Sequence, residues 1–530
     1  MMNKKRILFW VLLAGFIVGA LFWFFHVPYR PDRLYHVIPP NAEFVIRHDQ
    51  LAERWDDFSA NPLARALFTS MGLDPEELTE WGDDPELRVW MDKLLARHVL
   101  ITHVPELGPG RDPAWVLTGW IGGESIRLRW LLTRGRLAGM EMVPREAGGA
   151  YWLVDTDEDD EHLSISVVEG MLIGVLSRDP HAVRGILDVY DGIAPRHPMA
   201  RKDVREDAGP CGNDAHPDRG WFIGPTERGD RAKYFFAFEQ VDERGVRGAL
   251  CRREPGEMAP MVTRDIEVPS QFFGAVPFFM VGMHPESGAG LWLNRLPPAV
   301  QTVFREMQEE EDAELLLLAA TGGAYAGSIA GLSVPAVLAA WPIRDESAAL
   351  TRMNTVLDRL NAAFRWGLVT TETRVAGRSV HVVESTTDTP YANVRFRERV
   401  AFSMVDGWMV LASHASALMP LLERYEQPEA VIEADLGGWQ REVRAGDAAI
   451  YGYADISGGA RTLRMAISAW SMKLMFDDPR GTRETRQRLN EARAWIDTLE
   501  PLSGAHLWLD QQEDWLALRF ALGEYMEEDE

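Results

Sequence analysis

The densest group of candidate metal ligands is the acidic run DTDEDDEH, which begins at Asp155. Four of its carboxylates could act together as hard oxygen ligands for calcium: Asp155, Asp157, Asp159 and Asp160. An EF-hand loop needs Gly at its sixth position and Glu at its twelfth, where this chain has Asp160 and Ser166. The run therefore predicts at most a loose calcium site. A solvated hairpin tip is the alternative, because so much charge is rarely buried.

The cysteines and histidines give the next candidates. Cys211 and Cys251 are the only cysteines, and an even pair predicts a disulfide in an oxidising compartment. Two buried thiols are the alternative, and a metal site is not expected because neither has a second Cys or a near His at ligand spacing. His48, followed by Asp49, is interpreted as a structural histidine with satisfied hydrogen bonds.

Motifs for common chemistries are missing. The sequence has no G-x-S-x-G nucleophile elbow, no H-E-x-x-H zinc motif and no dinucleotide fingerprint. The glycine-rich stretch from Thr321 to Ser333 lacks the Lys of a phosphate loop. We therefore expect no cofactor apart from calcium, and we expect a protein that is not an enzyme.

An apolar segment at the N-terminus predicts a membrane anchor. Residues 7–25 carry no charge and follow Lys4, Lys5 and Arg6, and nineteen residues suffice for about one bilayer crossing. The positive-inside rule then keeps the N-terminus cytoplasmic and the body periplasmic. A cleaved signal peptide is the alternative, although bulky aromatics stand where a peptidase needs small residues.

Gly15 and Gly19 form a G-x-x-x-G motif inside this segment. Glycines at this spacing let two membrane helices approach closely, which favours a homodimer. The alternative is that glycine is simply common in membrane helices.

The elements that would position any site occur twice. SISVVEGMLIGVLS, from Ser164, matches AFSMVDGWMVLAS, from Ala401, and each reads as two strands joined by a tight acidic-Gly turn before a Ser-capped helix. PAWVLTGWIGGES, from Pro113, and PAVLAAWPIRDES, from Pro335, form a second pair. A third, fainter pair joins NAEFVIRHD, from Asn41, to AVPFFMVGMH, from Ala275. Three matches in the same order indicate a duplication.

This pattern predicts an α+β fold class: an N-terminal single transmembrane helix, then a duplicated unit of largely antiparallel sheets with helices packed on one face, plus a shortened third unit. The expected parts are a cytoplasmic stub and anchor (1–33), a first repeat (34–195), an insertion with both cysteines (196–269), a second repeat (270–430) and the shortened unit with its acidic tail (431–530).

Charge limits the partners. The chain has 80 Asp+Glu against 55 Lys+Arg, a net charge of −25. This balance excludes nucleic acid as a partner, because a phosphate backbone is bound by basic surfaces. The remaining expected partners are the lipid bilayer, through residues 7–25, and a second envelope protein.

The P-x-[N/D]-A opening strand, the repeated S-x-V-[D/E]-G hairpin and the single anchor resemble uncharacterised bacterial membrane-anchored envelope proteins of the domain-of-unknown-function kind. The resemblance is architectural, over residues 34–525, and implies no catalytic residues. It implies a membrane-anchored, extracytoplasmic binding or scaffold protein. The alternatives are an envelope hydrolase, with carboxylates brought together between the two repeats, and a weak divalent-cation binder.

Overall fold

The structure, a computed structural model, divides the chain into two units. The first comprises Met1–Glu243 and Gly248–Arg253, and the second comprises Arg244–Arg247 and Glu254–Glu530. The structure describes residues 27–65, 74–107, 112–137, 140–145, 151–154, 162–202, 209–212, 216–225, 231–253, 279–283, 316–321, 327–329, 332–334, 336–386, 399–426, 448–461, 502–512 and 514–523, with single residues between 464 and 496.

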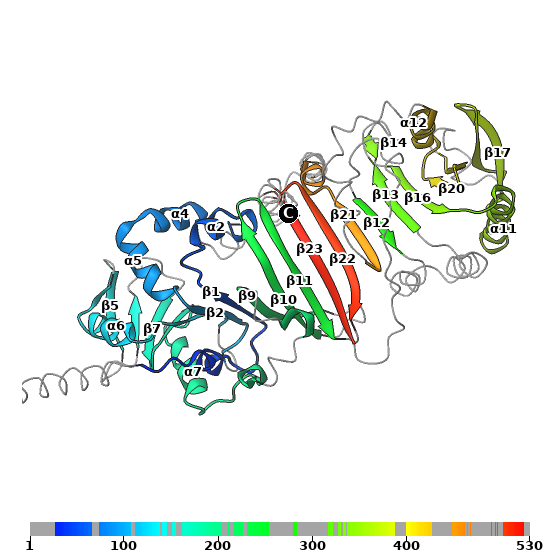
Figure 1. The fold of residues 1–530 in the computed structure, drawn as a ribbon. Helices are drawn as coiled ribbons and strands as arrows, with labels where there is room; N and C mark the ends of the chain where they lie inside the picture. Colours follow the sequence, from blue (N-terminus) through cyan, green and yellow to red (C-terminus); the bar gives the residue numbers. More distant parts are fainter. Residues whose placement is uncertain are drawn as a thin grey trace, which may run out of the picture. The chain divides into compact units, whose positions relative to one another are not determined.

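The first unit is built on strands, with short helices between them (Figure 1). Its strands are β1 (Phe44–Asp49), β2 (His98–Val104), β3 (Ala114–Trp120), β4 (Arg136–Leu137), β5 (Met140–Pro144), β6 (Trp152–Val154), β7 (His162–Val168), β8 (Met171–Ser177), β9 (Asp218–Pro225), β10 (Arg231–Asp242) and β11 (Gly245–Arg253). Its helices are η1 (Pro31–Val37), α2 (Trp55–Ala60), α4 (Pro75–Asp83), α5 (Pro85–Leu94), α6 (Glu124–Thr133), α7 (Ala182–Tyr190), η2 (Pro198–Ala200) and η3 (Gly209–Gly212).

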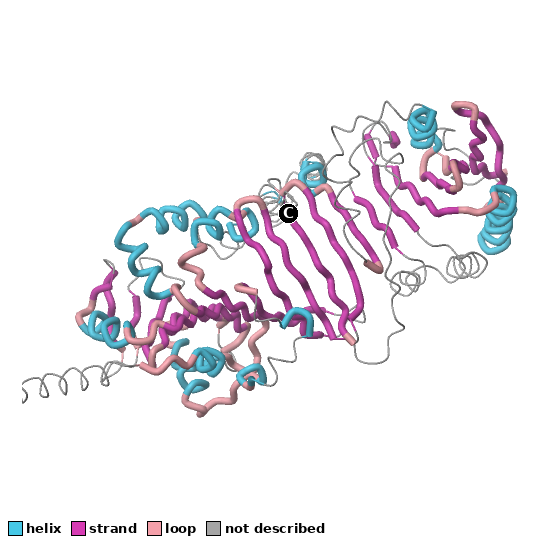
Figure 2. The backbone as a smooth tube through the Cα atoms, viewed as in Figure 1, coloured by secondary structure: helices cyan, strands magenta, loops and turns pink. Residues whose placement is uncertain are grey.

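The second unit is again dominated by strands (Figure 2). The strands are β12 (Phe279–Met283), β13 (Leu316–Thr321), β14 (Gly327–Ile329), β15 (Leu332–Val334), β16 (Ala336–Pro342), β17 (Leu368–Val375), β18 (Arg378–Ser385), β19 (Ala401–Val405), β20 (Trp408–Ala412), β21 (Ile450–Ala454), β22 (Gly504–Gln512) and β23 (Trp515–Gly523). The helices are α11 (Glu346–Phe364) and α12 (Ala415–Glu426).

The two units pair their strands in the same order. In the first unit the order is β5-β6-β7-β8-β3-β2-β1-β9-β10, all antiparallel. In the second it is β17-β18-β19-β20-β16-β13-β12-β21-β22, also antiparallel. Strands β21 to β23 complete this second sheet, as β9 and β10 extend the first. The expectation of a separate, shortened third unit is therefore wrong.

The repeated hairpins have the expected turns. Glu169 and Gly170 join β7 to β8 with φ of 45° and 88°, and Asp406 and Gly407 join β19 to β20 with φ of 47° and 81°. Two consecutive left-handed residues form the type I′ turn that matches the twist of antiparallel strands. Glycine at the second position adopts this conformation without a Cβ clash.

The sequence predicts that the serines after these hairpins cap helices, but in the structure they do not. Ser177 Oγ donates to the carbonyl of Pro113, at the start of β3. Ser413 Oγ accepts from the amide of Val337, at the start of β16. In each unit the serine thus ties the end of a hairpin to the neighbouring strand.

Helices cover both faces of each sheet, which corrects the prediction of helices on one face. In the first unit, Ile186 of α7 belongs to the core on one face, and Leu128 of α6 belongs to the core on the other. In the second unit, Leu418 of α12 and Met353 of α11 lie in two different cores. The reason lies in strands such as MLIGVLS, which are apolar at successive positions and so must be covered on both faces.

The predicted transmembrane architecture is also corrected. None of the helices in the described residues is long and apolar enough to cross a membrane. The longest of them, α11, has 19 residues but carries charged side chains along its length. The predicted single-pass, periplasmic localisation depended on a spanning helix, so it is contradicted as well. Residues 7–25 lie outside the described residues.

Candidate functional site

The centre of the first sheet brings two arginines together. On β1, Val45, Arg47 and Asp49 share one face, because side chains alternate along a strand. The register places Arg47 directly opposite Arg219 of β9 on one side and opposite Leu100 of β2 on the other. Like charges in directly opposite cross-strand positions destabilise a sheet, and here Asp49 offsets the charge of Arg47.

This face forms the floor of a pocket with a volume of about 210 Å³. The covering residues come from η1, η2 and η3 and from Lys202. The lining residues are Asp32, Tyr35, Val45, Arg47, Leu100, Met199, Lys202, Cys211, Gly212, Arg219, Gly220, Trp221 and Phe235. Three of these side chains are cationic and one is a carboxylate, which reverses the acidic balance of the whole chain.

Trp221 adds an unsatisfied donor to this wall. The residue is 2% exposed, and its Nε1–H has no hydrogen-bond partner in the described part of the chain. His197 stacks on the indole ring at 4.4 Å, and Lys233 Nζ lies 4.6 Å from the ring centroid. Burial lowers the pKa of His197 to about 4, so this imidazole is neutral at pH 7. A buried N–H without an acceptor costs free energy that a ligand acceptor could recover.

Arg47 is held in place by Asp49. Its Nε and Nη2 lie 2.7 and 3.0 Å from the two carboxylate oxygens, a bidentate pair. Burial alone would raise the pKa of Asp49, but hydrogen bonds from His98 and Arg47 outweigh it and lower that pKa. Burial opposes the charge on Arg47, but Tyr35 and Asp49 outweigh this effect and raise its pKa above the usual value. The guanidinium is therefore charged and fixed in orientation.

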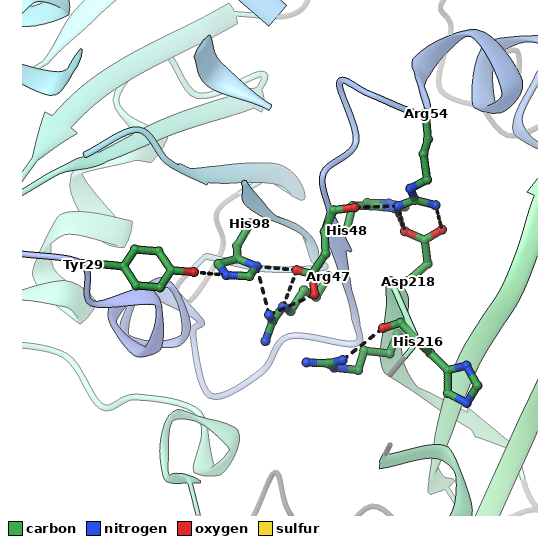
Figure 3. A network of polar contacts seen from close by, with 9 residues as sticks. Tyr29, Arg47, His48, Arg54, His98, His216 and Asp218 are labelled. Carbon is green, nitrogen blue, oxygen red and sulfur yellow. Dashed lines mark hydrogen bonds and ion pairs between the residues drawn. The ribbon is translucent and has the colours of Figure 1, made fainter. Parts of the chain in front are cut away.

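The network continues from Asp49 to the N-terminal segment (Figure 3). Asp49 and His98 are directly opposite on β1 and β2, and His98 Nδ1 donates to Asp49 Oδ1. Arg47 Nη2 also lies 2.9 Å from His98 Nδ1, but the Asp49 oxygen is the closer partner and can only accept, so the proton is assigned to Nδ1. Tyr29 Oη then donates to His98 Nε2. A carboxylate, an imidazole and a hydroxyl are thus connected in series.

The opposite face of the same strands carries a closed ion cluster (Figure 3). Asp218 is 1% exposed and accepts from His48 Nδ1 at 2.8 Å and from both terminal nitrogens of Arg54 at 2.7 Å. Burial raises the pKa of Asp218, but these hydrogen bonds outweigh it and lower the pKa to about 2. The partner of His48 is therefore Asp218, whereas the neighbouring Asp49 pairs with Arg47 and His98.

The second unit shows that the fold does not require these charged residues. When the paired strands are followed from the matching hairpins, Phe44 of β1 corresponds to Phe279 of β12. Arg47, His48, Asp218 and Arg219 then correspond, in that order, to Gly282, Met283, Ile450 and Tyr451. The same sheet is built there without these charges, so the charges serve something other than the strand order.

The predicted site residues have different outcomes. Cys211 and Cys251 form the disulfide, and Cys211 also lines the pocket. The calcium candidates Asp155, Asp157, Asp159 and Asp160 lie outside the described residues, as do Gly15 and Gly19 of the dimer motif. Within the described residues, no group of three or more His, Cys, Asp or Glu side chains could hold a metal ion.

The pocket arginines and the Tyr29–His98–Asp49 series were not predicted from the sequence. One local signal is present on β9, where Arg219 shares its face with the apolar residues Trp221 and Ile223. The pairing of the two arginines depends on cross-strand register, which no short motif encodes.

Comparisons with known proteins add no assignment. No protein-family model matches the chain, and no curated protein or solved structure matches it.

Proposed function

We propose that this chain is a binding protein whose first unit takes up a small organic anion. The observation that carries the proposal is the directly opposed pair Arg47 and Arg219 on the floor of a pocket. An anion between two guanidiniums would accept charge-assisted hydrogen bonds from both. Lys202 lines the same pocket and adds a third cation.

The pocket also constrains the rest of the ligand. Its volume of about 210 Å³ lies below the ~300 Å³ at which sites for drug-sized ligands begin. Val45, Leu100, Met199 and Phe235 offer apolar contacts beside the cations. A carboxylate attached to a single ring or a short chain fits this combination better than a bare inorganic ion.

Titration calorimetry with benzoate, compared with its neutral analogue benzamide, tests the proposal. We expect benzoate to bind and benzamide to bind at least tenfold more weakly. Arg219→Gln should weaken benzoate binding by roughly tenfold or more, because a hydrogen bond to a charged group contributes about 1.5–3 kcal/mol.

Arg127→Gln is the matched control, since Arg127 lies on α6 outside the pocket and its side chain is 60% exposed. This variant should bind benzoate as the wild type does. Equal binding of benzoate and benzamide, or an unchanged affinity in Arg219→Gln, would contradict the proposal.

A further inference from the structure

We propose that Tyr29, His98 and Asp49 form a nucleophilic site at which Tyr29 Oη accepts an acyl group from a carboxylic ester. The three residues stand in the order that activates a hydroxyl, with a carboxylate orienting an imidazole that accepts the hydroxyl proton. The inference does not rest on anion binding in the pocket.

Two elements fix the base and its orienting carboxylate. Asp49 ends β1 and His98 begins β2, and antiparallel pairing places them directly opposite one another. The bidentate contact with Arg47 prevents rotation of the Asp49 carboxylate. With the His98 proton assigned to Nδ1, toward the Asp49 carboxylate, Nε2 is the proton acceptor facing Tyr29.

The phenol is held in place yet remains accessible. The Tyr29 ring meets Trp120 edge-to-face at 5.8 Å, and the Arg97 guanidinium lies 5.5 Å from its centroid. Tyr29 is 52% exposed, so a substrate can reach it. Tyr151 and Tyr451 also bond to imidazoles, but both are only 2% exposed. Among these three pairs, Tyr29 is the one open to solvent.

The reaction balances with the groups present and water. Tyr29 Oη attacks the ester carbonyl while its proton passes to His98 Nε2, and Asp49 stabilises the resulting imidazolium. The carbon–oxygen bond to the alkoxide breaks, and the imidazolium protonates the leaving group. Water then hydrolyses the acyl-phenol ester, with His98 as base, and restores Tyr29. The Arg97 guanidinium over the Tyr29 ring adds positive charge near the site at which negative charge develops.

Burial raises the pKa of the Tyr29 phenol, despite the opposing effects of Arg47 and Arg97. The phenol is therefore protonated at neutral pH. Nucleophilic attack then requires a base, and His98 Nε2 occupies the position of that base.

The test is covalent labelling of the full chain with phenylmethanesulfonyl fluoride, followed by peptide mass spectrometry. Tyr29 Oη displaces fluoride from sulfur, and the phenol proton leaves with the fluoride through His98. We expect sulfonylation of Tyr29 and none of Tyr190, a matched tyrosine whose hydroxyl donates to Glu169 Oε2 instead of an imidazole.

His98→Ala should slow labelling of Tyr29 by about 100-fold, the usual contribution of a general base. Added imidazole should restore part of the lost rate, which a purely structural role of His98 would not produce. Asp49→Asn should also slow labelling, while the thermal unfolding of each variant is measured to confirm folding. Labelling of Tyr29 at the rate of Tyr190, or an unchanged rate in folded His98→Ala, would overturn the inference.

Discussion

Asp218 shows how one carboxylate can depend on its surroundings for its charge. It is buried on the face opposite the pocket and is kept ionised by Arg54 and His48. Arg54 Nη2 also donates to the carbonyl of Asp49, so the cluster connects the start of α2 to the end of β1. Removing the carboxylate alone would leave the buried His48 without its partner, which costs about 1–3 kcal/mol, and would leave the part-exposed Arg54 without its ion pair.

This residue predicts a pH dependence of stability. The pKa of Asp218 is about 2 in the folded chain and near 3.8 when exposed, so the unfolded state binds the proton more readily. The stabilisation is complete above about pH 4 and is lost as the pH falls from about 4 to 2, a change of about 2 kcal/mol. Urea unfolding from pH 7 to pH 2 measures it.

A double variant that copies the second unit provides the comparison. His48→Met with Asp218→Ile reproduces the apolar pair Met283 and Ile450 and should be more stable than Asp218→Asn. It should also lack this acid-dependent loss. If the double variant loses stability with acid as the wild type does, the dependence belongs to other carboxylates.

At the scale of elements, the four-residue segment η3 forms part of the pocket wall. Cys211 lies in η3 and Cys251 in β11, and both are buried. The disulfide spans a sequence separation of 40 and fixes Cys211 against the sheet, where it lines the pocket. The covering of the pocket therefore depends on a covalent bond as well as on packing.

Cys251→Ala should lower both stability and anion affinity. The chain-entropy model gives a loss of about 4 kcal/mol in the free energy of unfolding for a loop of this length. Benzoate binding should weaken as well, because η3 is no longer fixed over the pocket. Urea unfolding under non-reducing conditions and calorimetric titration measure the two effects. Unchanged benzoate affinity in a destabilised variant would show that η3 does not shape the site.

At the scale of the whole molecule, the two units have separate hydrophobic cores. Ile186 is fully buried in the first unit, and Leu418 is fully buried in the second. Domains with their own cores commonly unfold as separate transitions. Scanning calorimetry should resolve two transitions. Ile186→Ala should lower the free energy of unfolding for one transition, and Leu418→Ala should lower it for the other, each by about 2–5 kcal/mol. Both variants lowering the same transition would contradict this expectation.

The sequence was informative wherever structure is local. The Glu169–Gly170 and Asp406–Gly407 turns are recognisable because the turn residues and the apolar runs beside them are contiguous. The same apolar runs also imply that helices cover both faces of each sheet, although the prediction placed helices on one face. Tyr29, His98 and Arg219 could not be placed together, because their proximity to β1 depends on strand order and register across nearly 200 residues.

The basic pocket has a consequence for how fast a ligand arrives. The chain carries a net charge of −25, so the long-range field repels an anion before the local charges of Arg47 and Arg219 attract it. At physiological ionic strength the screening length is about 8 Å, so salt weakens the distant repulsion more than the attraction at close contact. For the proposed anion, added salt should therefore accelerate entry into the pocket even as it weakens the bound complex. The association rate and the residence time of the ligand accordingly respond to ionic strength in opposite directions.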